Sequence, residues 1–150
     1  MSAQPVTSIR TQVRDIFMAA LTQLHGSDEA RVKDPEIVTD YLQETEIKKS
    51  ASYGVIVTDE SLEQHSQGSV DVTLIVLVIV YVRSESDRRA LLDAAIEDIW
   101  RVLGSGQMLK PIVPYVRLES VTTNENSTDS KPYAQAQMRW AARVRRPVSW

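Results

Sequence analysis

The longest apolar run in the chain lies at residues 70–82. It reads Val-Asp-Val-Thr-Leu-Ile-Val-Leu-Val-Ile-Val-Tyr-Val and contains neither glycine nor proline. Aliphatic and β-branched residues at this density are typical of a strand. A transmembrane helix needs about 18–20 apolar residues, and the run is shorter than that. We therefore expect a buried strand and not a membrane span.

Side chains alternate between the two faces of a strand, and the two faces of this strand differ. One face is apolar throughout: Val70, Val72, Leu74, Val76, Val78, Val80 and Val82. The other is polar at its ends and apolar in the middle: Asp71, Thr73, Ile75, Leu77, Ile79, Tyr81 and Arg83. The chain's own helices can cover the first face. Something else must cover the second, so Ile75, Leu77, Ile79 and Tyr81 are predicted to form a subunit interface.

The N-terminal part of the chain predicts two helices. Residues 6–24 repeat apolar side chains at three- and four-residue spacing, with Thr7 or Ser8 as N-cap and Gly26 as terminator. Asp34-Pro35-Glu36 then offers an N-cap, a proline at the first helical position and an acidic first turn. We expect a short helix from there to about residue 42.

Residues 87–103 form the clearest predicted helix, with Ser84 or Ser86 as its cap. Its apolar stripe consists of Leu91, Leu92, Ala95, Ile96, Ile99, Trp100 and Leu103. Gly104-Ser105-Gly106 resembles part of a phosphate-binding loop, but it follows a helix, whereas anions bind where a helix begins. It is therefore interpreted as a helix stop.

Three further strands are predicted, at residues 53–58, 115–122 and 133–144. A polar connection at residues 59–68 would join the first of them to the central strand. The order of elements predicts an α+β fold, a two-layer sandwich with a mostly antiparallel sheet of about four strands and helices packed on one face. The 150 residues form a single domain, with a flexible polar arm at residues 123–132.

Composition narrows the possible chemistry. The chain has no cysteine, which excludes disulfides, thiolate metal sites and a cysteine nucleophile. Its net charge of −3 argues against a dedicated nucleic-acid binder. No apolar segment typical of a secretory signal is visible at the N-terminus.

No catalytic, metal or cofactor-binding residue is predicted. His25 and His65 stand alone, without the spacing of a metal site. Asp93, Glu97 and Asp98 lie near one another on a helix and could suggest acid–base chemistry. They are expected opposite the apolar stripe, among arginines, which is typical of a solvated helix face.

The last predicted strand is basic, with Arg139, Arg143 and Arg145 on one face and Arg146 and Trp140 nearby. One interpretation is nucleic-acid binding through phosphates. A second is a solvated face or an edge protected by charge. A third is a head-to-tail contact, which can close a ring, with an acidic stretch of a neighbouring copy. That stretch consists of Asp34, Glu36, Asp40, Glu44 and Glu46. The last two interpretations are favoured over nucleic acid.

The layout resembles the tail terminator proteins of tailed bacteriophages, also called tail completion or head–tail joining proteins. The resemblance runs from about residue 6 to residue 144. It rests on the N-terminal amphipathic helix, the hairpin with a very apolar second strand, the serine-capped helix and the final hairpin with its long polar tip. It is a likeness of layout and includes no signature motif.

The resemblance implies a structural virion protein of the tail or neck, assembled in the host cytoplasm, with no enzymatic activity and no cofactor. Tail terminators form a ring, expected here to be a hexamer, that caps the tail tube, ends its polymerisation and joins the tail to the head. The implied partners are other copies of the chain, the tail tube protein, the head–tail connector protein and the tail sheath. Genomic DNA would pass through the lumen without specific binding, and no membrane is involved.

The resemblance also implies roles for particular surfaces. The apolar middle of the central strand would pack against a neighbour, and the basic strand would face a partner or the lumen. The polar arm would reach the tube, sheath or connector through Asn124, Glu125, Asn126, Asp129 and Lys131. Two alternatives remain: another neck or head-completion protein, and a small nucleic-acid-binding module that uses Arg139, Arg143 and Arg145.

Overall fold

A computed structural model describes residues 8–38, 50–84, 86–110, 112–125 and 133–147. The elements are α1 (Ile9–Thr22), β1 (Glu36–Val38), β2 (Ala51–Ser66), β3 (Ser69–Arg83), α2 (Arg88–Gly104), the 3₁₀ helix η2 (Gln107–Leu109), β4 (Tyr115–Glu125) and β5 (Tyr133–Pro147). The strands form one sheet in the order β1-β2-β3-β5-β4. β1 is parallel to β2, and all other neighbours are antiparallel.

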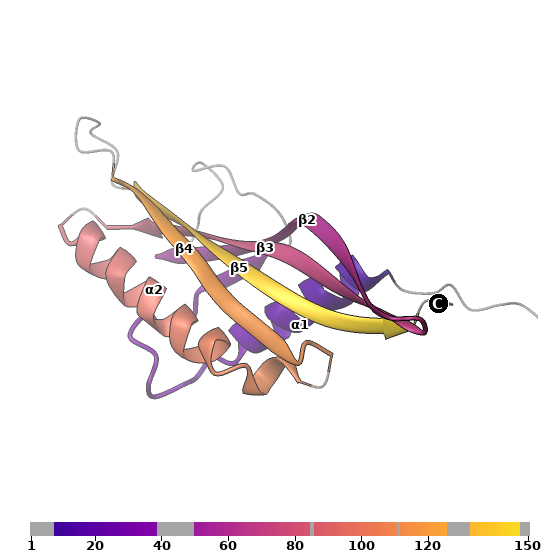
Figure 1. Ribbon diagram of the computed structural model, residues 1–150. Helices are drawn as coiled ribbons and strands as arrows, with labels where there is room; N and C mark the ends of the chain where they lie inside the picture. The colour runs from indigo at the N-terminus through magenta and orange to yellow at the C-terminus, as the bar shows by residue number, and fades with distance from the viewer. Residues whose placement is uncertain (1–7, 39–49, 85, 111, 126–132, 148–150) are drawn as a thin grey trace, which may run out of the picture.

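Both helices pack on the same face of the twisted sheet (Figure 1). This face is called the helix side below, and the opposite face the outer side. The arrangement confirms the predicted α+β fold with helices on one face. Among the described residues the sheet contains β1 in addition to the predicted strands.

The helix side of β3 forms the centre of the core. Its side chains from Val72 to Val82 are at most 1% exposed. They pack in one cluster with both helices and with β5, through Val13, Phe17, Leu21, Leu92, Ile99, Leu103, Met138 and Trp140. Full burial of one such aliphatic side chain contributes roughly 1.5–3 kcal/mol. The predicted core face of the central strand is therefore confirmed from Val72 to Val82, whereas Val70 at its start is half-buried.

The helix ends follow the sequence signals in part. Ser8 caps α1, and its Oγ accepts a hydrogen bond from the backbone N–H of Thr11 at 3.1 Å. The N-cap of α2 is Asp87, not the predicted Ser84 or Ser86. Ser84 instead accepts a hydrogen bond from the Asp87 N–H at 3.1 Å, so it orders the turn that precedes the helix.

The predicted helix stop after α2 is confirmed. Gly106 has a φ of 71°, a left-handed conformation that glycine adopts without steric cost. Its N–H donates to the carbonyl oxygen of Leu103 at 3.1 Å. This bond satisfies one of the carbonyl groups left unpaired at a helix C-terminus.

β1 stands where a short helix was predicted to begin. Residues 36–38 pair in parallel with Ser52, Tyr53 and Gly54. Asp34 has a φ of 50°, whereas an N-cap residue is normally extended. The prediction of a helix is therefore wrong for residues 36–38, because pairing with a distant strand overrides the local signal. Residues 39–49, which include the rest of the predicted helix, lie outside the described residues.

β2 is much longer than the predicted strand at residues 53–58. It begins at Ala51 and continues through the polar residues 59–66, with a register shift between Val57 and Asp59. Backbone pairing with β3 along this whole length explains why polar residues form a strand here. The predicted connection is thus a strand, followed by a tight turn at Gln67 and Gly68.

β4 also extends past its predicted end at residue 122. Thr123, Asn124 and Glu125 pair with Ala136, Gln135 and Ala134 of β5. Two residues of the predicted arm, Asn124 and Glu125, therefore belong to a strand. The other three, Asn126, Asp129 and Lys131, lie outside the described residues.

Candidate interaction surface

The apolar middle of β3 on the outer side is partly buried within the protomer. Ile79 is 0% and Ile75 9% exposed, whereas Leu77 and Tyr81 are half-buried. Leu77 lies between Ile56 of β2 and Arg139 of β5 in the sheet register. Of the four residues predicted to form an interface, Leu77 and Tyr81 therefore retain surface that a neighbour could cover.

Three basic side chains of β5 lie on the same outer side, and each contacts a residue of its own chain: Arg139, Arg143 and Arg145. Arg139 Nε lies 3.1 Å from a carboxylate oxygen of Glu119. Arg145 Nε lies 2.9 Å from a carboxylate oxygen of Asp71. The guanidinium of Arg143 stands 5.9 Å from the centre of the Tyr115 ring.

These contacts do not saturate the arginines, because the side chains of Arg139 and Arg145 remain 46% and 56% exposed. As the sequence predicted, Arg139, Arg143 and Arg145 lie on one face of the strand. The side chain of Arg146 lies outside the described part of the structure. In the acidic stretch predicted to face the basic strand, only Asp34 and Glu36 are described.

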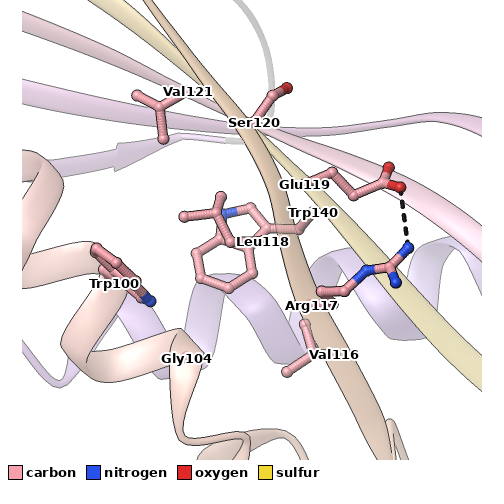
Figure 2. Close-up of a pocket in the computed structure, with 9 residues that line it drawn as sticks. All are labelled: Trp100, Gly104, Val116, Arg117, Leu118, Glu119, Ser120, Val121 and Trp140. Carbon is pink, nitrogen blue, oxygen red and sulfur yellow. Dashed lines mark hydrogen bonds and ion pairs between the residues drawn. The ribbon is translucent and has the colours of Figure 1, made fainter.

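A groove of about 450 Å³ lies on the helix side, between the C-terminal half of α2 and β4. Figure 2 shows Trp100 of α2 facing β4 across it, with Leu118, Val121 and Trp140 along the strand side. Trp100 is 57% and Val121 40% exposed. The indole N–H of Trp140 is buried and has no hydrogen-bond partner among the described residues. The groove is mainly apolar.

Trp100 corrects the predicted apolar stripe, which placed it in the core. It lies at the rim of the stripe, where the indole covers Gly104. A Cβ atom at Gly104 would stand 2.7 Å from Cδ1 of Trp100, so only glycine lets the ring lie this close. The signal in the sequence was the width of the stripe, which is greater than one layer of core can cover.

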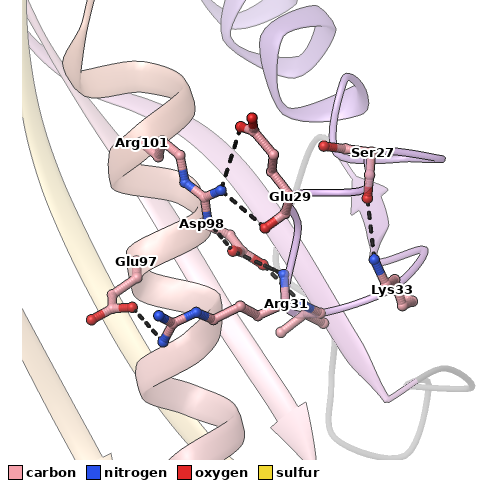
Figure 3. Close-up of polar contacts among 8 residues, drawn as sticks. Ser27, Glu29, Arg31, Lys33, Glu97, Asp98 and Arg101 are labelled. Atoms are coloured by element: carbon pink, nitrogen blue, oxygen red, sulfur yellow. Dashed lines mark hydrogen bonds and ion pairs between the residues drawn. The ribbon is translucent and has the colours of Figure 1, made fainter.

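A second polar feature joins α2 to the segment that follows α1. Asp98 is buried, with 0% of its side chain exposed, although it was predicted to lie on a solvated face. Its carboxylate accepts hydrogen bonds from the backbone N–H groups of Arg31, at 3.0 Å, and Val32, at 2.9 Å. Arg101 completes the cluster, at 2.8 Å from Asp98 and 2.9 Å from the Glu29 carbonyl oxygen (Figure 3).

The Asp98 cluster is structural. Its carboxylate satisfies backbone donors and pairs with one guanidinium, so it fixes the 27–33 segment against α2. Burial raises the pKa of Tyr53 above its usual value, and the negative charge of Asp98 adds to the effect. Glu97, the residue before Asp98 on the helix, forms an exposed ion pair with Arg31 at 2.7 Å.

The other candidates for chemistry do not assemble into a site. His25 Nε2 lies 2.5 Å from the carbonyl oxygen of Pro35, so it connects the end of α1 to β1. The side chain of His65 is not among those described. Across the described ranges, no three histidine, aspartate or glutamate side chains gather closely enough to hold a metal ion. Within the same ranges, neither helix has the length and apolarity needed to cross a bilayer.

The fold matches that of a solved structure, the PVC sheath/tube terminator of an extracellular contractile injection system in its extended state. The TM-score is 0.59, with 13% sequence identity over 99% of this chain and 58% of that chain. This chain has the fold of a sheath/tube terminator. The resemblance of layout to tail terminators is thus confirmed at the level of fold.

This chain spans 58% of the length of the PVC protein that it matches. A chain in the virion of a native gene transfer agent particle gives a weaker match. Its TM-score is 0.41, with 12% identity over 93% of this chain and 92% of that chain. No protein-family model and no curated protein sequence matches this chain.

Proposed function

We propose that this protein is a structural subunit of a phage-tail-like particle, and that it forms a ring at the end of the tail tube. One observation carries the proposal: 99% of the chain matches the fold of a sheath/tube terminator. The ring, a hexamer by analogy with tail terminators, would cap the tube, end its polymerisation and join the tail to the head connector. The protein would then act in the virion without enzymatic activity or cofactor.

The outer side of the sheet supports an assembly role. Leu77 and Tyr81 are half-buried on it. The half-exposed Arg139 stands beside Leu77 in the register, and the half-exposed Arg145 lies further along β5, beside Asp71. Apolar side chains bordered by charge are typical of a surface that a partner covers. The partners in this proposal are neighbouring copies, the tube protein, the connector and the sheath, with DNA passing through the lumen.

Size-exclusion chromatography with light scattering tests the ring directly. We expect a discrete oligomer, either in the purified protein at high concentration or after addition of tail tubes from the same particle. Electron microscopy should then show one ring at a tube end and shorter tubes as the protein is added. A monomer under both conditions, with tubes of unchanged length, would refute the proposal.

Nucleic-acid binding through the basic strand has less support. Arg139, Arg143 and Arg145 already contact Glu119, Tyr115 and Asp71, so phosphates would compete with existing partners. A DNA-binding module would lose affinity steeply with added salt, and Arg143→Ala would reduce that salt dependence. We expect no measurable DNA binding by the isolated protein at low salt.

A further inference from the structure

The sheet has two long edges that are free among the described residues. β1 pairs with only three residues of β2, so residues 59–66 of β2 have β3 on one side and no described strand on the other. β4 is the last strand at the opposite end of the sheet. The unpaired N–H and C=O groups of an edge can pair with a strand of another chain. Below, residues 59–66 are called the β2 edge, and β4 is called the β4 edge.

The two edges are complementary on the helix side of the sheet. Leu62 points to this side, because it stands opposite Val72 in the register, and it is 65% exposed. On the β4 edge the same side carries the apolar groove lined by Val116, Leu118 and Trp100. An exposed leucine on one edge could therefore be buried against the exposed apolar groove on the other edge.

The edges are also complementary on the outer side. Asp59 and Glu63 of the β2 edge stand opposite Ile75 and Asp71, so both carboxylates point outward. On the β4 edge, Arg117 points to the outer side, away from Trp100 (Figure 2). Arg139 of β5 lies on the same side, and both arginines contact Glu119. Charge on an edge normally prevents pairing, but opposite charges on the two edges favour pairing of one with the other.

Strand direction and register allow the two edges to meet. β2, β3, β5 and β4 alternate in direction, so β2 and β4 run in opposite senses. A copy related by rotation about an axis along the strands would place its β2 edge antiparallel to β4, with helix side beside helix side. Asp59, Ile75, Ala141 and Arg117 lie on one row of the sheet, so that copy would bring its Asp59 opposite Arg117.

We propose that the β2 edge of one copy pairs with the β4 edge of the next copy and so continues the sheet between subunits. Asp59 faces Arg117 on the outer side. On the helix side the same register places Glu60 opposite Val116 and Leu62 diagonally beyond Val116, at the end of the groove. The contact joins two different surfaces, and such head-to-tail contacts close into rings. This inference rests on the proposed ring and names the surface on which its subunits meet.

Disulfide cross-linking tests the register. The chain has no cysteine, so only the introduced cysteines can form disulfides. Ser61 and Tyr115 share one row of the sheet, and both are exposed. Opposed residues of antiparallel strands lie about 4.5–5.5 Å apart between Cα atoms, which suits a disulfide. Oxidation of the double variant Ser61→Cys/Tyr115→Cys should give a ladder of covalent oligomers that ends at the ring size.

Two controls define the cross-linking result. Each single variant should give no species larger than a dimer. The pair Ser61→Cys/Thr122→Cys moves the second cysteine along β4. At about 3.3 Å per residue, position 122 lies roughly 20 Å from Tyr115. This pair should therefore give no ladder. An equal ladder from this control pair would overturn the proposed register.

A charge exchange tests the outer-side contact. Arg117→Asp should weaken self-association about tenfold, because it opposes two carboxylates in the interface. Asp59→Arg should restore association when it is combined with Arg117→Asp. Arg31→Asp is the matched control, because Arg31 is as exposed as Arg117 (64% and 62%) and likewise pairs with a glutamate. It should leave association unchanged.

The outcomes separate this inference from the proposed ring. Rings that are detected by light scattering, but give no ladder and no rescue, would overturn the edge contact and leave the ring proposal standing. A protein that stays monomeric both alone and with tubes, without cross-links, would overturn both. A dimer from Tyr115→Cys alone, without a ladder from the double variant, would point to a twofold contact and overturn the head-to-tail arrangement.

Discussion

The two faces of β3 share one strand but have different surroundings. On the helix side, Leu74, Val76 and Val78 are 0% exposed beneath α1 and α2. On the outer side, Leu77 is half-buried and lies beside a half-exposed arginine. Residues of the same type, a few positions apart, therefore have different surroundings: on the helix side they are buried in the core, and on the outer side part of their surface stays exposed.

Truncation of one leucine on each face gives the largest expected contrast. Leu74→Ala should lower the free energy of unfolding by about 3 kcal/mol, because it leaves a cavity in a closely packed core. Leu77→Ala should cost about 1 kcal/mol, since its side chain is only half-buried. Chemical denaturation of both variants measures the difference. Equal losses would show that the two faces contribute alike to the protomer.

The helix side is not wholly apolar, and Asp98 tests how much its polar contacts matter. Asp98→Ala should destabilise the protein by about 3 kcal/mol, because the N–H groups of Arg31 and Val32 lose their buried acceptor. Asp98→Asn keeps one acceptor oxygen and should cost less. Asp93→Ala, at an exposed site on the same helix, should stay within about 0.5 kcal/mol of the wild type. A small loss for Asp98→Ala would mean that water can replace the carboxylate.

The sequence predicted the parts of this contrast that depend on local periodicity. The apolar faces of α1 and β3 repeat at regular spacing, so their burial could be foreseen. The helix side of β5, with Met138 and Trp140, could be foreseen for the same reason.

Features that depend on distant segments were missed. Residues 36–38 form a strand because β2 lies beside them. Residues 59–66 pair with the neighbouring β3, but their polar side chains hide the strand from a search for apolar alternation. Asp98 is buried by a segment about 67 residues away in the chain, which no pattern within its own helix reveals. The same holds for the groove at Trp100, because it exists only where α2 meets the edge of the sheet.

A charge in the middle of the outer side separates folding from assembly. Leu77→Asp should leave the protomer folded, because the new carboxylate would lie beside Arg139 in the register. It should abolish the oligomer if a neighbour covers this face. Circular dichroism and light scattering on the same sample measure the two effects. Thr122→Asp, at an exposed outer-side position of β4, is the control and should change neither.

Complete unfolding of Leu77→Asp would contradict this separation of the faces. It would show that Leu77 belongs to the protomer's own core, as the buried Ile75 and Ile79 beside it on the strand do. The predicted subunit interface would then have to lie elsewhere, and the edges of the sheet would be the next surface to test.

The smallest expected effect is on the pH dependence of stability. It comes from Tyr53 and tests how well the helix side is shielded from water. Its side chain is 0% exposed, and its hydroxyl has no hydrogen-bond partner among the described residues. Burial, followed by the charge of Asp98, raises its pKa above the usual value of 10.0. Above pH 10 the unfolded chain therefore releases a proton that the folded chain retains, so stability falls as pH rises.

Tyr53→Phe should remove this loss while changing little at neutral pH, because no described residue loses a hydrogen bond when the hydroxyl is removed. Between pH 10 and 11 the wild type should lose up to about 1.4 kcal/mol more than the variant, the contribution of one proton per pH unit. Urea denaturation at pH 8, 10 and 11 measures the difference, and other tyrosines and lysines cancel in the comparison. Parallel pH profiles would show that Tyr53 ionises as readily in the folded protein as in the unfolded chain. The helix side around it would then be open to water, and the contrast between the two faces of the sheet would be weaker than their burial indicates.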